Sequence, residues 1–70
     1  MDLSRAAKLI KSLERDPEHV QTYYGDLDAA IRWLMDTTFE ATDAKEKARL
    51  AATEMRARLV LEAFRKRGTN

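Results

Sequence analysis

The chain has 70 residues and a mass of 8.1 kDa, which is enough for one small domain. Thirty-one residues are apolar, but eleven of these are alanine, so only twenty larger side chains can fill a core. The absence of cysteine excludes disulfides and cysteine-based zinc sites. No apolar run reaches the ~18–20 residues of a membrane span, and no signal-peptide pattern opens the sequence. A core of this size rarely supplies more than about 3–5 kcal/mol, so we expect the chain to work with partners.

Composition and charge predict a soluble all-α protein, and the absence of cysteine fits the reducing cytoplasm. Charged residues make up 36% of the chain, which has only two glycines and one proline. The net charge is +1, but it is segregated. Residues 1–15 carry a net +2, residues 16–43 a net −6 and residues 44–70 a net +5. This distribution favours packing of the acidic middle against the basic ends.

The first predicted helix spans about residues 3–14. Asp2 or Ser4 can cap its start, and it must end before Pro17, because the residue before proline disfavours the α region. Its apolar positions recur at helical spacing and form one face: Leu3, Ala6, Leu9, Ile10 and Leu13.

The second predicted helix spans about residues 17–41. Asp16 suits the N-cap and Pro17 the first helical position. A heptad stripe then follows without a break: Val20, Tyr24, Leu27, Ile31, Leu34, Thr38 and Ala41. Gly25 weakens this helix by roughly 1 kcal/mol relative to alanine. In the alternative, a short helix ends at Tyr24 and a second one starts with Asp26 as its N-cap.

The third predicted helix spans about residues 44–66, and residues 67–70 form a frayed tail. Asp43 and Glu46 have the spacing of a capping box. Gly68 supplies the stop signal behind a basic last turn.

The third helix carries apolar residues on two opposite sides. One stripe is rich in alanine: Ala48, Ala51, Ala52, Met55, Leu59 and Ala63. The other is bulkier: Leu50, Ala57, Leu61 and Phe64. Because two stripes need two partners, we expect a short N-terminal helix and a long antiparallel helical hairpin, in one domain over residues 1–70, which dimerises into a four-helix core. The pattern leaves open which stripe forms the dimer interface.

Four side chains are candidate contacts for a protein partner: Trp33, Phe39, Leu61 and Phe64. Trp33 lies off the heptad stripe, on a polar side of its helix, and tryptophan is frequent at interaction hot spots. The alternative is that Trp33 packs under the first helix or the dimer mate. Met35 and Phe39 are expected to be covered by another helix.

A second set of candidates is basic: Arg49, Arg56, Lys66 and Arg67. These side chains share one broad sector of the third helix and could contact phosphates or an acidic protein. The segments are long and do not resemble a helix-turn-helix. A solvated face that complements the acidic second helix is the simplest interpretation.

No catalytic, cofactor or metal site is predicted. His19, the single histidine, has no second ligand motif and no nucleophile pattern beside it, and no glycine-rich phosphate loop is present. The chain has the general look of small helical accessory proteins of phages and plasmids, although no motif assigns it to a family. The sequence therefore favours a non-enzymatic module that binds and regulates a larger protein; the alternative is a small dimeric DNA-binding regulator that uses the basic C-terminal helix.

Overall fold

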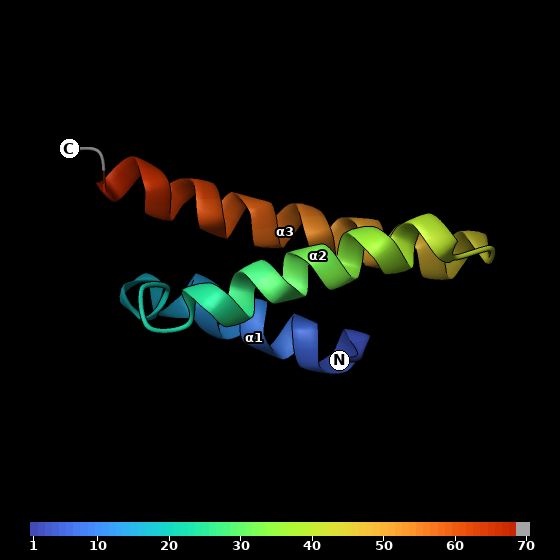
Figure 1. Cartoon of the computed structure of the whole chain (residues 1–70), viewed down its shortest axis with the longest axis horizontal. Coiled ribbons are helices and arrows are strands. Elements are labelled where there is room, and N and C mark those ends of the chain that lie inside the picture. Colours follow the sequence, from blue (N-terminus) through green and yellow to red (C-terminus); the bar gives the residue numbers. More distant parts are fainter. Residues whose placement is uncertain (69–70) are drawn as a thin grey trace.

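A computed structural model describes residues 1–68 of the chain and shows an all-α fold, as predicted. The elements are α1 (Leu3–Arg15), a 3-10 turn η1 (Pro17–His19), α2 (Tyr24–Glu40) and α3 (Ala44–Gly68). Successive helices run in opposite directions, and the molecule measures 41 × 19 × 17 Å (Figure 1). The short first helix and the long α2–α3 hairpin of the prediction are both present.

Helix α1 begins where its cap predicts. Asp2 has extended backbone angles, and its Oδ1 accepts a hydrogen bond of 2.8 Å from the backbone N–H of Arg5. Ala6, Ile10 and Leu13 are buried on the predicted face. The helix ends at Arg15, one residue beyond the expected boundary.

The prediction of one helix over residues 17–41 is wrong at its first seven residues. Residues 17–19 form a 3-10 turn, residues 20–23 form further turns, and α2 starts at Tyr24 with Tyr23 as its N-cap. The break thus precedes Gly25, and Asp26 lies within the helix. A helix from Pro17 would leave only Asp16 to reverse the chain, whereas helix–helix connections usually need two to eight residues.

Helix α3 starts at its predicted cap and runs further than expected. Asp43 Oδ2 accepts a hydrogen bond of 2.9 Å from the backbone N–H of Glu46, which is the main contact of a capping box. Arg67 and Gly68, predicted as part of a frayed tail, are helical, while residues 69–70 of that tail lie outside the described residues. Basic side chains in the last turn stabilise the negative end of the helix, which explains the extension.

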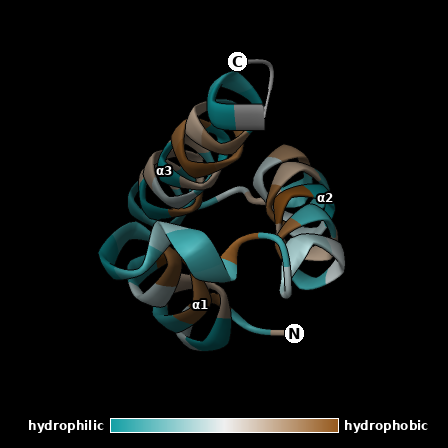
Figure 2. Cartoon of the chain, turned by 90° about the vertical axis from the view of Figure 1, so that its left-hand side faces the viewer, coloured by the Kyte–Doolittle hydropathy of each residue, from teal (hydrophilic) through white to brown (hydrophobic). Residues whose placement is uncertain are grey.

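The three helices form a triangle when seen along the long axis, with α1 on one side of the α2–α3 hairpin (Figure 2). Helix α3 packs most extensively on α2 and also on α1, and the contact of α1 with α2 is smaller. The core is made of buried apolar side chains from the three helices and from the turn before α2: Ala6, Ile10, Leu13, Val20, Leu27, Ala30, Ile31, Leu34, Leu50 and Ala57. With 13 residues against 25, α1 spans about half the length of α3, so much of the hairpin has no third helix beside it.

Candidate interaction surface

The structure resolves which stripe of α3 faces the core. Leu50 and Ala57 are buried, and Leu61 and Phe64 are half-buried against the core cluster. Thr53, between them, is buried, and its hydroxyl donates a 2.8 Å hydrogen bond to the carbonyl of Arg49. The bulkier stripe therefore packs within the subunit. All six residues of the alanine-rich stripe are exposed: Ala48, Ala51, Ala52, Met55, Leu59 and Ala63.

Large apolar side chains stay exposed on both helices of the hairpin. Phe39 is 87% exposed, Met55 65%, Leu59 60% and Met35 45%. Met35 of α2 contacts α3, because the Arg58 guanidinium donates to its sulfur at 2.9 Å. We group these exposed residues of α2 and α3 under the name hairpin face: Met35, Phe39, Ala48, Ala51, Ala52, Met55 and Leu59. Both Met35 and Phe39 were expected to be covered by another helix. Within residues 1–68, Phe39 is not covered, and Met35 is covered only in part, by its contact with α3.

The four predicted partner contacts divide into two groups. Phe39 is exposed on the hairpin face. Trp33, Leu61 and Phe64 are half-buried and pack against the core, and the ring of Phe64 lies 5.9 Å from that of Tyr24. The structure therefore does not bring these four side chains together on one surface.

Met35, Met55 and Leu59 of the hairpin face were not among the predicted contacts. The exposure of Met55 and Leu59 could be inferred from the sequence only by deciding which stripe of α3 fills the core. One signal was available, since the stripe with Leu50, Leu61 and Phe64 offers more volume to a chain that is short of large apolar residues.

The four basic candidates are also separated. Arg56 donates hydrogen bonds to both carboxylate oxygens of Glu14, which ties α3 to the end of α1. The Nζ of Lys66 lies 3.7 Å from the Oε1 of Glu62 on the same helix. Arg49 and Arg67 are exposed. Ion pairing thus draws two of the four charges into contacts within the chain.

The hydrogen bonds from Arg56 lower the pKa of Glu14 and raise the pKa of Arg56. A carboxylate whose pKa is lower in the folded state stabilises the fold above its unfolded pKa, and this contribution disappears as the pH falls through the folded pKa. We therefore expect the melting temperature of the intact chain to fall as the pH is lowered below about 4.5. The melting temperature of Glu14→Gln should fall less over the same range, because the variant has no carboxylate to protonate at this position. The measurement is thermal unfolding followed by circular dichroism between neutral and acidic pH. Because both groups are partly solvated, the expected difference is small, and identical pH profiles would show that the pair is not formed in solution.

An apolar groove lies between the end of α1, η1 and the C-terminal half of α3. Its volume is about 290 Å³. The lining is mostly aliphatic or aromatic, with Glu14 and Arg67 as its charged members: Leu13, Glu14, Pro17, Val20, Leu59, Val60, Ala63, Phe64 and Arg67. With this lining the groove offers apolar contact and no arrangement of acid, base and nucleophile.

His19 is exposed, and its ring makes an edge contact with Tyr23 at 6.5 Å. Within residues 1–68, no three His, Asp or Glu side chains converge as metal ligands would. Over the same residues, none of the helices combines the length and apolar character that crossing a bilayer requires.

Comparison of this chain with models of protein families, with curated protein sequences and with solved structures finds no match.

Proposed function

We propose that this chain is a non-enzymatic protein-interaction module, and that it regulates a larger protein by binding to it. The observation that carries the proposal is the exposure of four large apolar side chains on the hairpin face: Met35, Phe39, Met55 and Leu59. A chain with about twenty large apolar side chains that leaves four of them in water gives up a substantial part of its hydrophobic stabilisation. Contiguous exposed apolar surface is typical of interaction sites.

The proposal includes self-association. A homodimer in which two hairpins meet through their hairpin faces would form the four-helix core expected from the sequence. The larger protein would then be bound by the dimer or would compete with the second copy for the face. Cytoplasmic location is part of the same proposal.

Co-purification from the source cell tests the function. We expect the intact chain to retain a specific larger protein, and Phe39→Glu to lose it, because a carboxylate would replace an exposed apolar contact. Ser12→Glu is the matched control, since it adds the same charge on an exposed position of α1. Reciprocal capture with the identified protein must reproduce the result.

If Phe39→Glu and Met55→Glu both stay folded, as judged by circular dichroism, and both keep every partner that the intact chain binds, the interaction function of this face is wrong.

A DNA-binding regulator is the second candidate, and the exposure of Arg49, Arg65 and Arg67 on α3 favours it. None of these three guanidinium groups forms an ion pair within the described residues. Binding through phosphates weakens steeply with salt, so even non-specific association would be visible at ~50 mM salt. A gel-shift titration that shows no complex at that salt concentration would remove this candidate.

A further inference from the structure

The outward side of α1 is strongly basic and carries no acidic side chain. An α-helix turns by about 100° per residue, so residues 4, 5, 8, 11, 12 and 15 fall within an arc of about 120°. All six are exposed; four of them are basic and the other two carry hydroxyls. We call this surface the basic face of α1: Ser4, Arg5, Lys8, Lys11, Ser12 and Arg15. Figure 2 shows α1 at one corner of the helix triangle, with one side turned away from α2 and α3.

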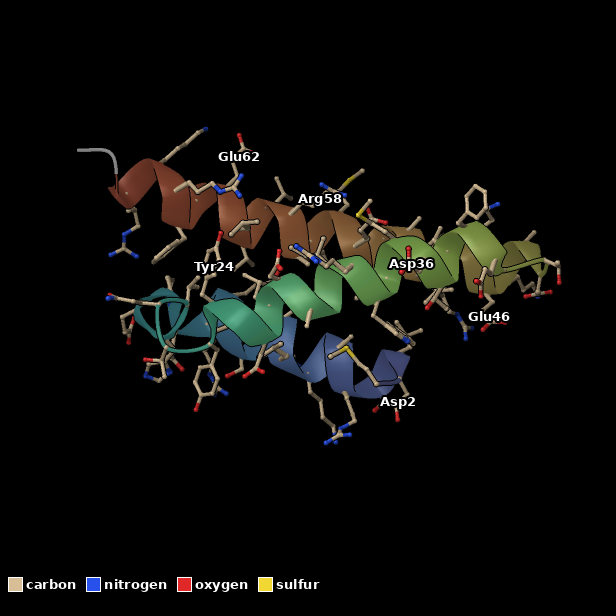
Figure 3. The ribbon with its side chains drawn as sticks, viewed as in Figure 1. Asp2, Tyr24, Asp36, Glu46, Arg58 and Glu62 are labelled. Atoms are coloured by element: carbon tan, nitrogen blue, oxygen red, sulfur yellow. The ribbon has the colours of Figure 1, made fainter. Side chains whose placement is uncertain are left out.

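The acidic residues of the first helical segment do not neutralise this face. Asp2 and Glu14 both lie outside the arc. Asp2, at the start of α1 (Figure 3), accepts the backbone N–H of Arg5 as the helix cap, and Glu14 pairs with Arg56 of α3. Within residues 1–68, the four basic side chains of the face form no ion pair. Their charges therefore remain available to a ligand.

Two carboxylates from neighbouring segments border the face. Asp16, which follows α1, lines a surface hollow together with four residues of the face: Lys8, Lys11, Ser12 and Arg15. Asp26 of α2 lines a second hollow with Arg5. Counted with both carboxylates, the four basic side chains leave a net charge of +2. The positive charge is reduced at the border of the face and is not cancelled.

Other carboxylates of η1 and of the start of α2 have basic neighbours of their own. Glu18 lines a separate hollow with Arg67, and Asp28 pairs with Arg32 at 3.2 Å. These acidic groups are thus engaged away from the basic face.

We propose that the basic face of α1 binds the phosphate backbone of a double-stranded nucleic acid. Arginine, lysine and serine are among the side chains that contact phosphates in such complexes. Arg5 and Arg15 are separated by a rise of about 15 Å along the helix. Over that length each strand of a duplex presents about four phosphates. This site contains no residue of the hairpin face and none of the α3 arginines, so it is separate from both functions considered above.

The composition of the face favours a phosphate backbone over an acidic protein or a membrane. Protein interfaces have an apolar centre and are depleted in lysine, whereas this face has no apolar or aromatic side chain. A helix that lies on a membrane buries its apolar side in lipid, but the apolar side of α1 is buried in the core of the protein. Single strands are disfavoured too, because their bases stack on aromatic rings.

The row of like charges is unfavourable for the free chain. Lys8, Lys11 and Arg15 are three and four residues apart, and like charges at these spacings repel each other on a helix. On α3, by contrast, the exposed Arg58 pairs with Glu54 four residues away. Phosphates bound along α1 would remove the repulsion, so the ligand and the free helix differ in the sense that favours binding.

Fluorescence anisotropy of a labelled DNA duplex of about 20 base pairs, titrated with the intact chain between ~20 and ~200 mM salt, tests the site. We expect a dissociation constant of about 10⁻⁵ M at ~50 mM salt, and a slope of about −3 for the logarithm of the binding constant against that of the salt concentration. Two unrelated sequences should bind equally, because backbone contacts carry no sequence information. An RNA duplex of the same length is titrated alongside to show which nucleic acid binds better.

A double variant locates the contact on α1. Lys8→Gln with Lys11→Gln should weaken binding at least tenfold at ~50 mM salt and make the slope less negative by about two, because each lost phosphate contact changes it by about one. Glutamine has nearly the helix propensity of lysine, and circular dichroism shows whether the fold is retained. Lys47→Gln with Arg65→Gln is the matched control, since it removes the same charge from exposed positions of α3. It should leave the slope unchanged.

The site and the proposed function fail in different experiments. Ser12→Glu places a carboxylate in the basic face, and should lose the duplex while it keeps the larger protein. Phe39→Glu on the hairpin face should do the reverse. The absence of a complex at ~20 mM salt would overturn the inference. Equal losses from the α1 and α3 double variants would overturn it as well, as would tighter binding to vesicles of anionic phospholipid than to the duplex.

Discussion

Replacing Leu50 with alanine is expected to remove most of the stability of the fold. The side chain is 1% exposed and lies on the buried stripe of α3. Leucine-to-alanine changes in such positions cost about 3–4 kcal/mol, because they remove buried surface and leave a cavity. A 70-residue core supplies only about 3–5 kcal/mol in total. We therefore expect Leu50→Ala to be largely unfolded at room temperature.

The matched control is Leu59→Ala on the same helix. Leu59 is 60% exposed, and alanine has the higher helix propensity, so the change should alter the free energy of unfolding by less than about 1 kcal/mol. Urea denaturation of both variants at one low chain concentration, where association contributes little, provides the comparison. A larger loss from Leu59→Ala than from Leu50→Ala would mean that the two stripes of α3 are assigned to the wrong sides, and equal losses would mean that Leu59 is as buried as Leu50.

Helix boundaries were predictable where a local signal sets them. Asp2 and Asp43 each accept a backbone N–H three residues ahead, and this contact depends only on neighbouring residues. The start of α2 was not predictable in this way. Its heptad pattern runs back to Val20, which is indeed buried, but Val20 reaches the core from a turn. Periodicity shows that a residue is buried and does not show which backbone conformation presents it.

The two-sided character of α3 was also predictable, but the inward side was not. Both stripes satisfy the same helical spacing, so the choice depends on how α1 and α2 fill the space beside them. Trp33 illustrates the same limit. It lies off the heptad stripe of α2, yet it is half-buried against the core, because a third helix covers a second side of α2. The candidate contacts chosen from the sequence therefore fell on both interior and exterior positions.

Alanine shows most clearly what the sequence could not distinguish. Ala57 is fully buried on the inner stripe, while Ala48, Ala51 and Ala52 are exposed on the outer one. On the inner side, a small residue lets neighbouring helices approach closely. On the outer side, the same residue type is exposed to solvent and is not part of the core of its own subunit. The residue type is identical, and only the neighbours define its role.

Enlarging Ala57 to leucine is accordingly expected to destabilise the fold by about 1–3 kcal/mol, since a well-packed core accepts extra methylene groups only by shifting side chains or helices. Ala29→Leu, at an exposed position of α2, is the matched control and should change the free energy of unfolding by less than about 0.5 kcal/mol. Urea denaturation gives both values. A neutral or stabilising Ala57→Leu would show that the helices stand further apart at this point than the buried alanine indicates. In that case small size at position 57 would not be what sets the close approach of α3 to the other two helices.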